Sequence, residues 1–300
     1  MNSFANLKRQ SGNLDKLSKA IEALNTNSES SDKSDNFWRP QVDKAGNGMA
    51  IIRFLPAPGA DGDDSLPWVK MHSHGFQGPG GWLIDNCLTT KNQQCPVCEH
   101  NSALWNSGIE ANKEIVRKQK RKLNYIANVY IVSDPANKEN EGQVKLFKFG
   151  KKIYDKITEA MNPAFEDEVK FNPFDLWGGA NFKLKIRKVD GYPNYDKSEF
   201  ESVSALSNDD AKLESIWKAE HSLLELVSDK EFKTYEQLKT RLDKVLGING
   251  SPVKAKTTIE QIRESAPKKV EDDAPWVDNS TTDDDEDDLS YFKKFADLDD

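Results

Sequence analysis

Two of the chain's three cysteines stand two residues apart in the stretch QQCPVCEH, residues 93–100, and this motif limits the possible folds more than any other. A C-x-x-C pair lets two thiolates reach one tetrahedral Zn²⁺ from a tight turn, so it supplies half of a four-ligand site. The third cysteine, Cys87, precedes Cys95 by eight residues. Because three thiols cannot close a four-ligand site, a metal-binding fold needs a histidine as its fourth ligand.

A histidine close to the cysteines has to complete such a site. The candidates are His72, His74 and His100, with His221 much farther along the chain. The turn sequence GPGG at residues 78–81 separates His74 from Cys87, so a hairpin would bring these two to one end. His72 has the same strand parity as His74, which leaves both open on spacing. His100 is a poorer candidate because it follows the C-x-x-C pair by two residues, where the chain already turns away.

A site filled by three thiolates and one imidazole has no open position for water or substrate, so we expect one structural Zn²⁺. One alternative is ordinary buried cysteines beside a surface histidine. Another is a redox pair, which lacks the βαβ context typical of such motifs. The sequence shows no Walker loop, no nucleophile elbow and no further cluster of histidine and carboxylate beside the cysteines. We therefore expect a binding protein and not an enzyme.

The charge of the chain is unevenly distributed. Of the net charge of −8, residues 270–300 contribute −11 through 13 carboxylates and two lysines, so residues 1–269 carry +3. Crowded like charges stay solvated and commonly serve as interaction segments. We therefore predict an acidic, partner-binding tail that includes Asp283, Asp284, Asp285, Glu286, Asp287, Asp288, Phe292 and Phe295.

Three segments of different character divide the chain. Residues 1–36 combine a short helical pattern with a Ser-rich link and predict a flexible N-terminal arm. Residues 37–248 have the pattern of a mixed domain, and residues 249–300 that of a linker followed by the acidic tail. No run of about 18 apolar residues and no apolar leader is present, which indicates a cytoplasmic protein without a membrane segment.

The pattern of residues 37–248 predicts an α+β fold with a mainly β core. Short alternating apolar runs bounded by Gly and Pro predict strands at residues 48–56, 123–132, 144–149 and 180–189. Helical periodicity predicts two packing helices, over residues 209–227 and over residues 232–245 before a stop at Gly247.

Cations and aromatic residues recur together along this core. They are Lys118, Lys120, Arg121, Lys122, Tyr125, Phe147, Lys151, Lys152, Lys183, Lys185, Arg187, Tyr192 and Tyr195. Cations follow phosphates and rings stack on unpaired bases, whereas duplex readout prefers a basic recognition helix. Any one cluster alone is also typical of a solvated face or of core aromatics. Their recurrence favours binding of a single-stranded nucleic acid.

These motifs resemble those of a known family. The blocks NFWRPQVDKAGNGMAIIRFLP, HGF, W-x-I-x-x-C, CPVC, KRK-x-x-Y-x-AN, FGKKI-x-DK, GANF-x-LK and NYD-x-S-x-F follow one another over residues 36–200. This is the order found in the T-even phage single-stranded-DNA-binding (helix-destabilising) protein family. The arm and the segment after Phe200 are similar to that family in character more than in letters.

The resemblance implies an OB-fold with a zinc-binding subdomain at about residues 70–105, accessory helices, an N-terminal arm and an acidic tail. The metal ligands that it implies are His74, Cys87, Cys95 and Cys98, so it selects His74 among the histidines. In the implied DNA groove lie Lys120, Arg121, Lys122, Tyr125, Phe147, Tyr192 and Tyr195. Trp105 stands where the family has a tyrosine.

The implied function is cooperative, sequence-independent binding of single-stranded DNA during phage replication, recombination and repair, in the cytoplasm of the infected bacterial host. The implied partners are single-stranded DNA, further copies of the chain bound head to tail, and the polymerase, primase, helicase loader and recombination mediator. The family's cooperativity motif is reduced to Lys8 and Arg9, and the KRK block is followed by Leu123 and Asn124 where the family has Thr-Ser. A zinc-ribbon RNA-binding protein or transcription regulator is the rival interpretation.

Overall fold

A computed structural model describes residues 36–62 and 65–248 of the chain. Most of the predicted arm, with Lys8 and Arg9, and the whole predicted tail lie outside the described residues. The chain divides into two compact units, Met1–Trp38 and Arg39–Asp300. Of the first unit, only residues 36–38 are described, including the short strand β1 (Phe37–Trp38). All other described helices and strands belong to the second unit.

An antiparallel β-sheet dominates the second unit, with the central order β6-β5-β2-β7-β8. Its strands are β2 (Gly48–Phe54), β3 (Val69–Gly78), β4 (Gly81–Asn86), β5 (Lys122–Ser133), β6 (Val144–Phe149), β7 (Phe182–Val189), β8 (Tyr192–Asn194) and β9 (Glu199–Phe200). The four predicted strands are present as β2, β5, β6 and β7. The prediction of an α+β protein with a mainly β core is therefore confirmed.

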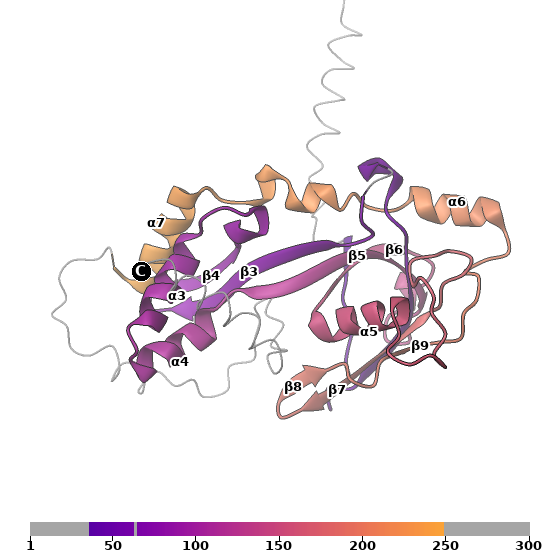
Figure 1. Ribbon diagram of the computed structural model, residues 1–300, viewed down its shortest axis with the longest axis horizontal. Coiled ribbons are helices and arrows are strands. Elements are labelled where there is room, and N and C mark those ends of the chain that lie inside the picture. Colours follow the sequence, from indigo (N-terminus) through magenta and orange to yellow (C-terminus); the bar gives the residue numbers. More distant parts are fainter. Residues whose placement is uncertain (1–35, 63–64, 249–300) are drawn as a thin grey trace, which may run out of the picture. The chain divides into compact units, whose positions relative to one another are not determined.

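The long strand β5 connects two regions of the sheet. Its second half pairs with β2, where Val129 stands opposite Phe54, and its first half pairs with β3, where Tyr125 stands opposite Lys70. The far half of β3 pairs with β4 in a hairpin that turns at residues 78–81. Strands β3 and β5 therefore run side by side from the central strands toward α3 (Pro96–Asn106) and α4 (Glu110–Gln119), as Figure 1 shows.

Alternation along the strands decides which side chains enter the core. In β7 the side chains of Phe182, Leu184 and Ile186 are buried, as the alternating pattern predicts, and the cations between them are partly or fully exposed. Phe54 of β2 is fully buried, and its ring packs edge-on against Phe149 with 5.6 Å between the centroids. Removing apolar surface of this kind from water stabilises the fold by roughly 25 cal/mol per Å².

Five α-helices are described: α3, α4, α5 (Lys151–Met161), α6 (Asp210–Lys218) and α7 (Tyr235–Leu246). The prediction of one helix over residues 209–227 was wrong in extent, because α6 ends at Lys218. Three residues after the helix end, the Asn128 side chain donates to the His221 carbonyl at 2.8 Å and accepts from the His221 N–H at 3.0 Å. These two backbone groups are therefore not available for helical hydrogen bonds. A 3-10 turn, η5 (Leu224–Val227), follows. No helix among the described residues has both the length and the apolar character needed to cross a membrane.

Helix α7 confirms the packing helix predicted before Gly247. Thr234 and Gln237 form a reciprocal capping box at its start, and Gly247 ends it with a φ of 72°. The helix contacts the β3–β4 turn, where the Gly80 N–H donates to the Val245 carbonyl at 2.8 Å. A Cβ at Gly80 would lie 2.0 Å from a backbone oxygen of α7, so this close approach requires glycine.

Candidate metal centre and nucleic-acid interface

Four side chains from neighbouring elements form the candidate metal centre. His74 belongs to β3, Cys87 precedes the 3-10 turn η3 (Leu88–Lys91), and the C-x-x-C pair begins α3 with Cys95 as its N-cap. Pro96 occupies the first helical position, where an N–H would have no intrahelical partner and a fixed φ suits the helix. The hairpin places His74 and Cys87 at one end, beside the first turn of α3, which contains Cys98.

The spacing of the donor atoms fits a tetrahedral ion. All four ligand atoms lie within 4.8 Å of one another. Cys87 Sγ and Cys98 Sγ are 3.5 Å apart. His74 Nε2 lies 3.5 Å from Cys95 Sγ and 3.6 Å from Cys98 Sγ. A tetrahedral Zn²⁺ requires about 3.8 Å between two sulfurs and about 3.6 Å between sulfur and nitrogen, so these three distances are close to those of a single four-coordinate ion.

All four side chains are buried, and their proximity changes their proton affinities. Burial disfavours a charged imidazole, but hydrogen bonds with Cys87 and Cys95 outweigh it and raise the pKa of His74 to about 9. Hydrogen bonding with Cys87 shifts the other two thiols in opposite directions. It lowers the pKa of the Cys95 thiol and raises the pKa of the Cys98 thiol. Sulfurs this close cannot all ionise without a cation between them. A cation bound between the sulfurs would relieve this repulsion.

The other two candidate histidines do not join the Cys3His group. His72 lies in the half of β3 that pairs with β5, and it contributes its backbone. Its N–H donates to Thr90 Oγ1 at 2.9 Å, and its carbonyl accepts from the Cys87 N–H at 2.8 Å. His100 lies on α3 beyond the ligating turn. The structure thus brings together the four residues that the family resemblance implied.

The far side of the His74 ring faces the chain that leads to the basic segment (residues 120–122). His74 Nδ1 lies 3.5 Å from the carbonyl oxygen of Gln119, the last residue of α4. The same carbonyl accepts a hydrogen bond from the buried Asn101 Nδ2 at 3.0 Å. A backbone oxygen facing the second nitrogen is the usual way of fixing the orientation of a metal-binding imidazole.

An apolar cluster packs around the Cys3His group. Its other buried members come from the hairpin, η3, α3 and α7: Phe76, Leu83, Leu88, Val97, Leu238, Leu242 and Val245. Asp85 of β4 forms ion pairs with Arg241 of α7 at 2.8 Å and with Lys233, just before α7, at 2.5 Å, and these pairs link this part of the chain to the hairpin. The cluster and α7 form one packed region, which we call the metal lobe (residues 73–119 and 235–246).

A row of rings lies on one face of the sheet. Tyr125 stands opposite Phe149, and Ala127 stands opposite Phe147, so these side chains share a face. The ring of Tyr125 stacks on Tyr154 of α5, with centroids 3.9 Å apart and planes 5° apart. Tyr125 and Phe147 are 7% and 3% exposed. The Tyr125 ring also stacks against Phe149, with centroids 5.9 Å apart and planes 19° apart, so it is packed among aromatic neighbours.

Lys70 belongs to the same face, although the sequence did not indicate it. Its side chain is exposed, and it stands directly opposite Tyr125 across the β3–β5 pair. Three residues farther along β3, Ser73 stands opposite Lys122 of the basic segment, on the other face of the strand pair. A cation next to a ring suits a single strand. Only the register of β3 against β5 could have revealed Lys70, because no local motif surrounds it.

Two other predicted lysines flank this face from α5. Lys151 and Lys152 form the first turn of α5, the helix that also carries Tyr154. Lys151 forms an ion pair with Asp155 at 3.0 Å. The basic segment, the ring row and the start of α5 are therefore connected through β5, against which α5 packs.

The predicted cations of β7 all have carboxylate partners. The pairs are Lys183 with Glu201 at 3.0 Å, Lys185 with Glu199 at 2.6 Å and Arg187 with Asp196 at 2.5 Å. Tyr192 begins β8, directly after the turn of the β7–β8 hairpin at Asp190 and Gly191. Its ring is exposed, and Tyr195 directly follows this strand.

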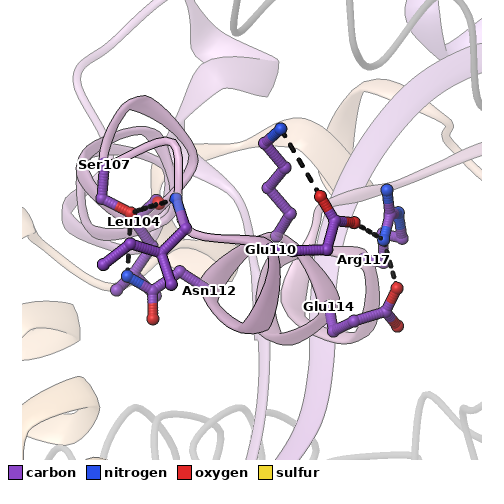
Figure 2. A network of polar contacts seen from close by, with 8 residues as sticks. Leu104, Ser107, Glu110, Asn112, Glu114 and Arg117 are labelled. Carbon is purple, nitrogen blue, oxygen red and sulfur yellow. Dashed lines mark hydrogen bonds and ion pairs between the residues drawn. The ribbon is translucent and has the colours of Figure 1, made fainter.

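Trp105 and Lys118 lie on the α3–α4 pair. Lys113 and Arg117 of α4 lie over the Trp105 ring, at 5.6 and 5.9 Å from its centroid. Arg117 is held in turn by Glu110 at 3.0 Å, within the polar network of Figure 2. The indole therefore packs beneath cations of its own chain, while Lys118 is exposed near the end of α4.

Known proteins are similar in sequence to this chain over most of its length. Residues 46–246 match the family described as gp32 DNA binding protein like. The single-stranded DNA-binding protein of Enterobacteria phage T2 is 39% identical over 260 residues, which cover 83% of this chain and 82% of that protein. The protein of the same name from Enterobacteria phage T4 is 38% identical over 240 residues, or 77% of each chain.

The fold and the site define a class: sheet-based proteins in which a closed Cys3His group adjoins a strand face of rings and cations. Within that class, the chain belongs to the gp32-like family of DNA-binding proteins.

Proposed function

We propose that this chain binds single-stranded DNA cooperatively and without sequence preference during phage replication, recombination and repair. One observation carries the proposal: the ring row and Lys70 share one strand face, and the basic segment begins the same strand β5, in a member of a DNA-binding family. The names of the T2 and T4 relatives support the choice of single-stranded DNA.

Rings and cations act on different parts of a single strand. Tyr125 and Phe147 are almost fully buried, so unpaired bases stack on them only if the neighbouring rings shift when DNA binds. Each stacked base contributes about 1 to 3 kcal/mol, while Lys70 and the basic segment attract phosphates. Neither contact reads the edges of the bases, so binding tolerates any sequence. A duplex keeps its bases stacked on one another and offers this surface only its phosphates.

The cations of β7 are proposed to act at the margin of the interface. A phosphate that binds Lys183, Lys185 or Arg187 must first displace a carboxylate, which offsets much of the gain. The exposed ring of Tyr192 on the adjoining strand can stack without such a cost. This hairpin is therefore assigned an outer contact, as are Trp105 and Lys118 on the helix pair.

We infer that the ion of the Cys3His group is Zn²⁺, because three thiolates and an imidazole at tetrahedral spacing favour it. A site with all four positions filled by protein has none for water or substrate, which supports a structural role and a non-enzymatic protein. We also propose that β2, β3, β5, β6 and β7 form an OB-fold. The bulge between Ile51 and Ile52 supplies the local bend that a small barrel needs.

The remaining assignments rest on family resemblance. Residues 37–248 are proposed to bind DNA, and residues 1–36, with Lys8 and Arg9, to mediate head-to-tail association. The acidic segment within residues 249–300 is proposed to recruit polymerase, primase, helicase loader and recombination mediator. The proposed site of action is the cytoplasm of the infected bacterial host.

A salt titration tests the function. The affinities for a fluorescent oligo-dT and for a duplex of equal length are measured at several salt concentrations, with the metal content determined on the same sample. We expect the logarithm of the affinity to fall linearly with the logarithm of salt concentration, and the Lys70→Ala variant to reduce that slope by about 1. Lys239→Ala, on the exposed side of α7, is the matched control and should leave the slope unchanged.

Three outcomes would contradict the proposal. A salt-independent affinity would exclude phosphate contacts, and equal affinity for duplex would exclude stacking on unpaired bases. Strong preference for one sequence or for RNA in competition with random oligonucleotides would favour a zinc-ribbon regulator instead.

A further inference from the structure

Thr89 lies between a metal ligand and the basic segment. Its hydroxyl oxygen is 3.1 Å from Cys87 Sγ and accepts a hydrogen bond from Arg121 Nη1 at 2.9 Å. The next residue, Thr90, bonds the backbone of β3 instead. Three side chains therefore form a continuous path from the buried Cys3His group to a cation of the proposed DNA surface.

Chemistry decides the direction of each hydrogen bond on this path. A guanidinium can only donate, so Thr89 accepts from Arg121 and keeps its own proton for Cys87. A cysteine bound to a metal is a thiolate and can only accept. The path thus runs from Arg121 through Thr89 to Cys87. A hydroxyl that accepts from a cation is a better donor, so each bond strengthens the other.

The backbone next to Arg121 is held from the same centre. The Gln119 carbonyl faces His74 Nδ1 and accepts from Asn101, as described above. One metal ligand thus contacts the main chain two residues before Arg121, and another reaches its guanidinium through Thr89. Both constraints depend on ligands whose positions a bound ion would fix.

We propose that Thr89 is a positioning residue, which couples the metal centre to DNA binding by holding the Arg121 guanidinium in place for a phosphate. The inference rests on the proposed function. With an ion bound, the Cys87 thiolate orients the Thr89 hydroxyl, and the hydroxyl orients Arg121. A long side chain that is already held loses less conformational freedom when a phosphate binds, so the affinity for single-stranded DNA is higher.

The Thr89→Val variant tests the path because valine keeps the shape of threonine and lacks its hydroxyl. In the Co²⁺-loaded protein we expect the thiolate-to-metal charge-transfer band to move to longer wavelength, since the sulfur loses a hydrogen bond that lowers its electron energy. Affinity for oligo-dT should fall about three- to tenfold, as expected for one hydrogen bond. Thr89→Ser, which keeps the hydroxyl, should restore both readouts.

A double-mutant cycle shows whether Thr89 acts through Arg121. In an Arg121→Met background, Thr89→Val should still move the charge-transfer band but cause no further loss of affinity. Thr240→Val is the matched control, because among the described residues the Thr240 hydroxyl bonds only the Glu236 carbonyl of its own helix, at 2.9 Å. It should change neither readout. Far-UV circular dichroism and one Co²⁺ per chain would verify that each variant is folded and loaded.

The outcomes separate the inference from the function on which it rests. A Thr89→Val variant with an unmoved band, or with wild-type affinity for oligo-dT, overturns the inference while the proposed function stands. Additive losses in the cycle, or no rescue by serine, overturn it as well. A loaded wild-type chain that fails to bind oligo-dT refutes the proposed function, whatever the band does.

Discussion

Glu220 is a carboxylate that the fold buries without giving either oxygen a hydrogen-bond partner among the described residues. It follows α6, in the segment where Asp61 accepts hydrogen bonds from the backbone N–H groups of Leu223 and Leu224 at 2.7 and 3.1 Å. Burial, and after it the negative charge of Asp61, raise the pKa of Glu220 to about 9. The folded protein therefore keeps Glu220 protonated near neutral pH, whereas the unfolded chain ionises it.

This difference in pKa makes stability fall as pH rises. Below the unfolded value near 4.5 both states are protonated and Glu220 costs nothing, and the loss grows until the folded pKa of about 9 is passed. Glu220→Gln should therefore stabilise the protein by up to roughly 5 kcal/mol at pH 8, or about 1.4 kcal/mol for each pH unit above 4.5, and hardly at all at pH 4.5, as measured by urea unfolding. The exposed Glu225→Gln is the control. An equal gain at both pH values would show that ionisation is not the cause.

The choice between His72 and His74 shows what spacing lacks at the residue scale. Both have the same strand parity, so either could face the cysteines. In the structure β3 changes partners between them: His72 stands opposite Leu123 of β5, whereas His74 stands opposite Asp85 of β4, the strand that leads to Cys87. Spacing left both open, and the family resemblance chose His74. Lys70 was missed for a similar reason, because its ring neighbour is 55 positions away in sequence and only register joins them.

At the scale of elements, α7 completes the metal lobe from a distant part of the sequence. Its Leu238, Leu242 and Val245 pack in one cluster with the three cysteines of the Cys3His group. Asp85, which is almost fully buried, balances its charge with Lys233 and Arg241. Helix α7 and the region around the Cys3His group bury apolar surface against each other, so the stability of α7 depends on the Cys3His group.

Removal of the metal should therefore loosen α7 as well as the cysteines. After chelation we expect amide hydrogen exchange to quicken at least about tenfold in β4, α3 and α7, because the cluster loses the ion that draws its ligands together. Strands β2 and β7 of the central sheet should keep their protection. Exchange measured by mass spectrometry before and after chelation checks this. Uniform acceleration throughout the sheet, or unchanged protection in α7, would contradict the dependence.

The sequence predicts the strands of this protein better than its helices, and the reasons are physical. The strands β5, β6 and β7 carry alternating or continuous apolar runs with clear ends, and such patterns predict strands well. Helix α4, with the sequence EANKEIVRKQ, has few apolar residues and is supported by ion pairs such as Glu110 with Arg117. It therefore has little periodicity to detect. The extent of α6 was mispredicted because a tertiary contact, Asn128 with His221, overrides a pattern that continues.

At the scale of the whole molecule, a weakly basic body is joined to a strongly acidic end. Residues 1–269 carry +3 and residues 270–300 carry −11. The net charge of −8 consequently misrepresents the surface proposed to meet DNA, where Lys70 and the basic segment lie beside the rings. A covalently attached run of carboxylates is always present at a high local concentration, so we expect it to compete with phosphates for the same cations.

Removing residues 270–300 should therefore raise the affinity for single-stranded DNA, and most at low salt. We expect a gain of about tenfold near 50 mM salt that shrinks to about twofold near 0.5 M, because exposed charges are screened beyond a Debye length. Fluorescence titrations with oligo-dT at both concentrations measure it. A full-length variant with Asn and Gln in place of the six acids at 283–288 should reproduce part of the gain. Phe292→Ala with Phe295→Ala, which keeps the charge, should reproduce none. A gain that is independent of salt, or that the double alanine variant matches, would mean that the tail acts through its apolar residues or its bulk and not through its charge.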